Sequence, residues 1–240
     1  QEMGYNISGS TITIFASRWG GVFTSMQNYL YFYIPLLTMS LVSKELSSGS
    51  IRLLYSSPIT NFQIIVGKFF SMMIYGFFMI AILFLIVLCS WGVVKDFDLP
   101  MVLVGLLGLY LLICAYAAIG IFMSSLTSYQ IVAAIGTFAV LMLLSMIGGW
   151  WQDYDFVRDV TYWLAMPGRS GKFIAGLICS EDVLYFLIVI FLFLTWTVYR
   201  LINRVQKRSW TTRWGIYLGV FLVSMMLGYM SSRPALMAYH

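Results

Sequence analysis

Three long stretches of the chain contain no charged residue, and they limit its possible folds more than any other feature. They cover residues 19–43, 69–94 and 99–152. An α-helix rises about 1.5 Å per residue, so about 20 apolar residues cross the hydrocarbon core of a bilayer. The third stretch is long enough for two crossings, and the chain can reverse at its polar cluster, 124–128. The pattern therefore predicts transmembrane helices.

The overall composition also indicates a membrane protein. Hydrophobic residues make up 61% of the 240 positions, charged residues make up 10%, and the mean hydropathy is +0.89. A soluble domain carries about a quarter charged residues, so most of this chain must be surrounded by lipid. We therefore expect an all-α fold, a polytopic transmembrane helical bundle. The six expected spans lie near 26–43, 66–92, 100–123, 130–150, 183–203 and 214–231.

The segment 151–182 differs from these spans, because it mixes charged residues, Pro167 and Gly168 with apolar stretches. It is too polar to cross the bilayer and too apolar for a free loop. We expect an extracytoplasmic segment of interfacial or re-entrant helices. Trp150 and Trp151, at its start, are candidates for a substrate contact at the outer face; the simpler explanation is a pair of aromatic anchors at the membrane interface.

Small residues gather in one of the expected spans. Ala115, Ala117, Ala118 and Gly120 lie close together in the sequence. Small side chains let membrane helices approach each other closely. We therefore expect a helix–helix contact here, with a substrate pathway as the alternative.

The charges between the spans predict the orientation of the chain. With 44–65 and 204–213 on one side of the bilayer, that side carries eight Lys and Arg residues, counting the span ends, and the other side carries six. Eight of the nine acidic residues lie on the second side, and the densely basic segment 200–213 lies on the first. Because basic loops are retained in the cytoplasm, the first side is predicted to be cytoplasmic. The basic residues thus orient the chain, and no nucleic-acid partner is expected.

The sequence lacks the residue sets that catalysis or metal binding requires. Its single histidine is His240, and its three cysteines share no metal-ligand spacing. Gly67-Lys68 and Gly171-Lys172 do not form a Walker A motif, because the first glycine and the following Ser or Thr are both missing. We therefore expect no catalytic residue, no metal and no cofactor of the chain's own. ATP that drives this protein would bind to a partner subunit.

The cytoplasmic stretch 43–68 is the most informative part of the sequence. Its first part, 44–57, is typical of a short amphipathic helix with Gly49 in its middle, after which the chain turns and re-enters the membrane. The residues alone leave two interpretations open. The helix either closes a loop at the membrane surface or receives force from a soluble partner.

Nine residues of this stretch form a spaced motif. They are Glu45, Gly49, Ser50, Ile51, Leu54, Ser57 and Pro58, followed by Gly67 and Lys68. The motif resembles the signature of ABC-2 type permeases, the membrane subunits of one class of ATP-binding-cassette exporters. The resemblance implies a coupling helix that sits in a groove of a separate ATPase subunit. The residues that would couple to the ATPase are Glu45, Gly49, Arg52, Leu53 and Leu54. Glu45 and Arg52 would be the polar partners.

The resemblance also implies a working assembly. Two permeases, as a homodimer or a heterodimer, would act with two ATPase subunits in the inner membrane of a bacterium, surrounded by lipid. Closure of the ATPases on ATP would push on the coupling helix and open a pathway to the outside for an unidentified substrate. The rival hypothesis is a membrane anchor or assembly scaffold of a cell-surface, gliding-type machine that transports nothing.

The expected domain boundaries depart from the family's pattern at both ends. The family's first span is absent, the chain opens with Gln1, and it stops soon after a hydrophobic segment, so we expect a piece of a longer protein. We assign 1–203 to a permease domain lacking its first span. We assign 204–240 to a basic cytoplasmic linker and an additional transmembrane helix leading to chain beyond residue 240. This extension resembles that of gliding-motility-type permeases.

Overall fold

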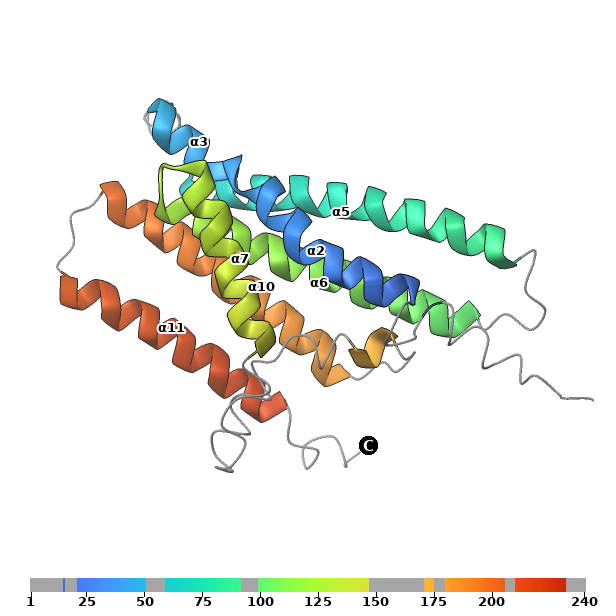
Figure 1. Cartoon of the computed structure of the whole chain (residues 1–240). Coiled ribbons are helices and arrows are strands. Elements are labelled where there is room, and N and C mark those ends of the chain that lie inside the picture. The colour runs from blue at the N-terminus through green and yellow to red at the C-terminus, as the bar shows by residue number, and fades with distance from the viewer. Residues whose placement is uncertain are drawn as a thin grey trace, which may run out of the picture.

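A computed structural model describes residue 15 and residues 21–50, 59–91, 99–146, 171–174, 180–205 and 210–231. Almost all of these residues are helical, and none of them forms a strand. The helices are α2 (Val22–Thr38), α3 (Ser40–Ser48), α5 (Asn61–Trp91), α6 (Leu99–Leu126), α7 (Gln130–Met146), α10 (Ser180–Val205) and α11 (Trp210–Ser231), shown in Figure 1.

Several of these helices are suited to a bilayer. Among the described residues, three helices are long and apolar enough to cross it: Asn61–Cys89, Leu99–Leu126 and Ser180–Asn203. Two shorter apolar helices occupy Gln130–Met146 and Trp214–Gly228. All five coincide with expected spans, so the predicted all-α membrane bundle is confirmed.

The first expected span, 26–43, is divided into two helices. The break falls at Met39, between α2 and α3. Pro35 lies inside α2 and has no N–H for the helix ladder. One turn later, the Thr38 hydroxyl donates a hydrogen bond back to the carbonyl of Ile34 at 2.9 Å, a contact that bends helices. The expected span 26–43 therefore contains most of α2 and the start of α3, which are separated only by Met39, and the backbone of Met39 is itself helical with φ −54° and ψ −35°.

Polar side chains mark the start of α5 and the end of α6. Thr60 and Gln63 form a capping box at the start of α5: the Gln63 amide donates to the Thr60 hydroxyl at 3.3 Å, and the Thr60 amide donates to Gln63 Oε1 at 3.0 Å. α6 ends at Leu126, and the hydroxyl of Thr127 then accepts a hydrogen bond from the amide of Tyr129 at 3.2 Å. The expected reversal at 124–128 is thus confirmed.

α6 is the central helix of the bundle, and α2, α3, α5, α7 and α10 all pack against it (Figure 1). In its most apolar stretch 72% of the residues are buried, against 22% in α5. A helix that is apolar on every side is typical of such a buried position. The outer helices instead expose large apolar side chains, as a surface facing lipid requires. Examples are Phe70, Phe77 and Phe78 of α5, Ile135 and Leu143 of α7, and Leu222 and Met226 of α11.

The core has two parts, a larger and a smaller cluster, which overlap along α6. The smaller part joins Val42 of α3, Ile65 of α5, Ala118 of α6 and Leu201 of α10. The start of α5 and the end of α10 therefore lie at the same end as α3. This arrangement agrees with the charge distribution, which places 44–65 and 204–213 on one side of the membrane.

The larger part of the core includes the short helical turn 171–174. Phe173 of this turn packs against Phe186 of α10, with ring centroids 6.2 Å apart, and Lys172 pairs with the buried carboxylate of Asp182 at 3.8 Å. The rest of the expected re-entrant segment, 151–170 and 175–179, lies outside the described residues.

Candidate coupling segment

α3 contains the described part of the expected coupling helix, and it ends sooner than predicted. Gly49 follows its last residue in the left-handed conformation, with φ 72°, which glycine adopts without steric cost. The hydroxyls of Ser47 and Ser48 donate to the carbonyls of Lys44 and Glu45, at 2.9 and 3.5 Å, where the helix leaves carbonyls unpaired. The prediction that one helix runs through Gly49 was therefore wrong, because this glycine terminates α3.

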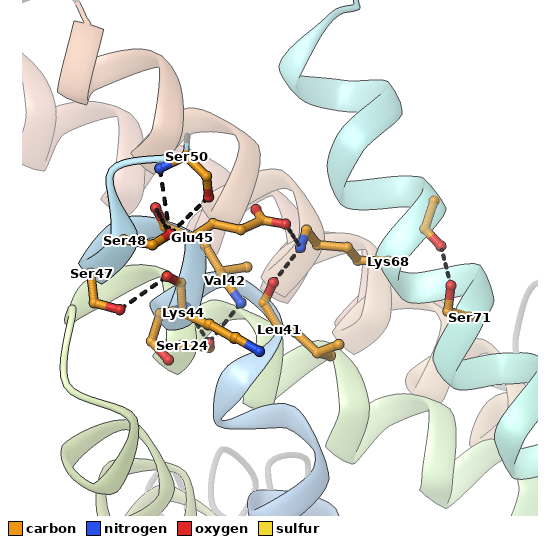
Figure 2. Close-up of polar contacts among 12 residues, drawn as sticks. Leu41, Val42, Lys44, Glu45, Ser47, Ser48, Ser50, Lys68, Ser71 and Ser124 are labelled. Carbon is orange, nitrogen blue, oxygen red and sulfur yellow. Dashed lines mark hydrogen bonds and ion pairs between the residues drawn. The ribbon is translucent and has the colours of Figure 1, made fainter. Parts of the chain in front are cut away.

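The start of α3 is capped by a residue from another helix. The flanking residue Met39 provides no side-chain cap, but Ser124 of α6 does (Figure 2). Its hydroxyl accepts hydrogen bonds from the amides of Val42 and Ser43, at 3.1 and 3.0 Å, and donates to the carbonyl of Met39 at 2.9 Å. The full hydrogen-bonding capacity of one hydroxyl is thus used. Ser124 ties the coupling segment directly to the central helix.

One turn before Ser124, Gly120 of α6 lies directly against Thr38 at the end of α2. A Cβ added to Gly120 would lie 2.6 Å from the Cβ of Thr38 and 2.9 Å from its Cγ2. Real Cβ atoms do not approach so closely, so this crossing needs glycine. The contact agrees with the prediction that the small residues at 115–120 let neighbouring helices approach closely.

Lys68 of α5 holds α3 from a second side. Its ammonium pairs with Glu45 Oε1 at 2.5 Å and also donates to the carbonyl of Leu41, one turn earlier in α3 (Figure 2). The side chains of Lys68 and Glu45 are 17% and 29% exposed, so water screens their attraction less than at an open surface. α3 is therefore fixed to both α5 and α6.

The structure describes two of the five residues expected to couple to the ATPase. Glu45 is half-buried in the pair with Lys68, and Gly49 is exposed at the end of α3. The other three, Arg52, Leu53 and Leu54, lie outside the described residues, as do Trp150 and Trp151 at the outer face. The coupling role of all these residues and the substrate contact stay predictions.

The sequence placed Ser124 only in the polar reversal at 124–128 and Lys68 only in the family motif, and it gave neither residue a partner. A signal for Lys68 was present, because it is the last charge before the uncharged stretch 69–94, and Glu45 is the only acidic residue on the predicted cytoplasmic side. A lysine at the edge of a bilayer needs an anionic partner or water. No local pattern identifies Ser124, since its partners are more than 80 positions away.

We expect the pair to contribute modestly to stability. A double-mutant cycle with Glu45→Gln and Lys68→Met should give a coupling energy of about 0.5–1 kcal/mol, because both groups are partly screened by water. Unfolding of the purified protein in mixed micelles, at low and high salt, measures it. A coupling energy of zero at low salt would show that the pair does not hold α3.

Comparison with known families agrees with this architecture. A family profile described as ABC-2 family transporter protein matches residues 14–152, which is more than half of the 240-residue chain. The match includes α2, α3, α5, α6 and α7. The chain therefore belongs to the ABC-2 transporter family, a family of multi-pass membrane permeases of ABC transporters, as the motif at 45–68 predicts.

The remaining comparisons add no closer identification. No curated protein and no solved structure gives a significant match. α10 and α11 lie beyond the end of the family match. The division of the chain at residue 203 into a permease domain and an extension therefore stays a prediction.

Proposed function

We propose that the chain is the transmembrane permease subunit of an ABC-2 type exporter in the inner membrane of a bacterium. The family match over 14–152 carries this proposal, because ABC-2 permeases in general work with a separate ABC ATPase. The substrate would move outward, driven by ATP hydrolysed on the partner. Neither glycine–lysine pair of the sequence is part of a Walker A motif, which supports placing the ATP on another subunit.

In this proposal the end of α3 and the residues after it form the contact with the ATPase. The last turn of α3 is available for such a contact, since Lys44, Ser47, Ser48 and Gly49 are exposed. A carboxylate has about four acceptor sites on its two oxygens. Glu45 can therefore pair with Lys68 and still accept a hydrogen bond from the ATPase.

The proposed assembly contains two permeases. α2 and α7 lie beside each other, with the rings of Phe32 and Phe138 5.1 Å apart. Both helices expose large apolar side chains, among them Tyr29 and Phe32 of α2 and Ile131 and Ile135 of α7. Such a surface is compatible with lipid and with the helices of a second permease.

Co-purification tests the proposal directly. An ABC ATPase subunit should be recovered with the tagged, intact protein from its native membrane, in a mild detergent. The double charge reversal Glu45→Lys with Arg52→Glu should release it, because both polar partners at the contact would then repel the groups that they bind. The ratio of ATPase to permease in the eluate is the measurement.

A charge swap separates a direct contact from a disturbed α3. Glu45→Lys alone breaks the internal pair as well as the contact, whereas Glu45→Lys combined with Lys68→Glu restores a pair of opposite charges. If Glu45 binds the ATPase, the swapped protein should still lose it. Recovery of the ATPase by the swapped protein would instead assign Glu45 to positioning α3.

The rival function predicts a different result for the unmodified protein. A membrane anchor or assembly scaffold needs no ATPase, so none should be recovered under any of these conditions. That outcome would contradict the exporter proposal and favour the scaffold.

A further inference from the structure

An apolar groove runs along the surface between α10 and α11, which pack side by side (Figure 1). Its volume is about 670 Å³, within the range of about 300–1,000 Å³ that is usual for small-molecule sites. On α11 it extends from Gly215 to Leu227. The helix rises about 18 Å over this distance, and one leaflet of the hydrocarbon core is about 15 Å deep. The groove is therefore as long as one leaflet.

Two glycines open the groove on the side of α11. Gly215 and Gly219, one turn apart, both line it, and a Cβ added to either would have no neighbour within 4 Å. By contrast, a Cβ added to Gly105 of α6 would lie 2.6 Å from the ring of Phe23. The opposite wall is formed by apolar side chains of α10, among them Phe191, which is 70% exposed. The groove is thus suited to a long apolar group from outside the chain.

One end of the groove is basic. Arg213 lies two positions before the first groove residue of α11, and Arg200 and Arg204 lie in the last turns of α10. These charges have no acidic counterpart nearby in the sequence, because no Asp or Glu occurs from 183 to 240. The only acidic residue predicted on this side of the membrane is paired with Lys68. A ligand that is apolar along its length and anionic at one end complements this arrangement.

We infer that the groove between α10 and α11 binds an acidic phospholipid, with one acyl chain along the groove and the phosphate group at its basic end. Trp214, next to Arg213, is 55% exposed, and tryptophan favours the level of the lipid head groups. The basic end therefore lies at the level of the phosphates. Basic residues between membrane helices bind acidic head groups. The inference adds a lipid partner to the proposed function and requires no ATPase.

Lipid binding to the purified, intact protein tests the inference. The protein in lipid-free detergent is mixed with phosphatidylglycerol or phosphatidylcholine that carry the same acyl chains, and native mass spectrometry measures the fraction of protein bound to each. Phosphatidylglycerol should bind at least about five-fold more tightly, the contribution expected of one lysine or arginine near a head group. Equal affinities for the two lipids would overturn the inference.

Gly219→Leu tests whether the acyl chain occupies the groove. The new side chain begins in open space, so the thermal midpoint in lipid-free detergent should stay unchanged. The affinity for phosphatidylglycerol should fall at least about ten-fold, the effect of removing about two methylene groups from contact. Gly67→Leu on α5 is the matched control, because a Cβ there also has no neighbour within 4 Å but lies outside the groove. Equal lipid binding by the two variants would show that the acyl chain lies elsewhere.

Arg204→Gln with Arg213→Gln tests the position of the phosphate group. The affinity for phosphatidylglycerol should fall towards that for phosphatidylcholine, which should itself stay unchanged. Arg158→Gln with Arg169→Gln removes the same charge on the predicted opposite side of the membrane and should keep the preference for phosphatidylglycerol. A preference that survives in the first double variant contradicts a head group at the basic end.

A different occupant of the groove would give a different pattern. If a second copy of the chain covers the groove, Gly219→Leu should lower the dimer fraction and leave the affinity for phosphatidylglycerol unchanged, and the inference is then wrong. None of these measurements involves an ATPase. Failure of the lipid site therefore leaves the exporter proposal standing, and failure to recover an ATPase leaves the lipid site standing.

Discussion

Replacing Gly120 of α6 by alanine is expected to destabilise the protein more than adding a methyl group to Gly67 or Gly76 of α5. The new Cβ would lie 2.6 Å from the Cβ of Thr38, which is close to the backbone of α2 and cannot swing away. α2 must then move off α6, and overpacking of this kind costs about 1–3 kcal/mol or more. The midpoint of thermal unfolding in detergent measures the loss.

Two glycines of α5 provide matched controls for this substitution. A Cβ at Gly67 has no neighbour within 4 Å, so Gly67→Ala should be neutral or slightly stabilising through its helix propensity. A Cβ at Gly76 meets the Cγ2 of Ile113 at 2.9 Å, a terminal methyl group of a side chain. Gly76→Ala should therefore lose an intermediate amount of stability. Adding Thr38→Gly to Gly120→Ala removes the atoms in contact and should restore part of the stability. Equal effects at Gly120 and Gly67 would contradict the close crossing of α2 and α6.

The second large effect is expected for Ser124→Ala. The change leaves the amides of Val42 and Ser43 without the hydroxyl that accepts from them, and it removes a donor from the carbonyl of Met39. Buried polar groups left unpaired cost about 1–3 kcal/mol. We therefore expect Ser124→Ala to lower the free energy of unfolding of the bundle by about this amount. We also expect faster hydrogen exchange at the first turn of α3, because local opening there becomes easier.

Ser224→Ala is the matched control for this serine. Ser224 is also buried, at 6% exposure, but its hydroxyl donates to the carbonyl of Phe221 in its own helix at 2.8 Å. Its loss should cost little and should leave exchange in α3 unchanged. If Ser124→Ala behaves like Ser224→Ala in both measurements, Ser124 does not cap α3.

The positions of most helices could be predicted because the bilayer restricts the sequence so strongly. A crossing segment needs a long apolar run, and its backbone must be paired within the helix. The uncharged stretches 69–94 and 99–152 therefore identified α5, α6 and α7, and the polar cluster at 124–128 identified the reversal between α6 and α7. The coupling motif at 45–68 indicated the family, which the profile match then confirmed.

Two details of the coupling segment could not be predicted in this way. The stretch 26–43 is uncharged throughout, so its charge pattern does not show that α2 ends at Thr38. Gly49 was compatible with the interior of a helix at a cost of about 1 kcal/mol, and only its left-handed backbone shows that it ends α3. At Gly49 the backbone geometry ends the helix, whereas at Met39 the backbone stays helical and the ladder is interrupted by Ser124, which accepts from the amides of Val42 and Ser43.

By itself the sequence determined that this is a membrane protein, where most of its helices lie and which family it belongs to. It also led us to predict which stretch faces the ATPase in the proposed exporter. Only the tertiary structure decided how that stretch is held. Ser124 is 82 positions from Val42, and Lys68 is 23 positions from Glu45. Hydropathy and local spacing describe how one helix meets its solvent. They carry no information on which face of a helix meets another, because that depends on the packing of all the helices together.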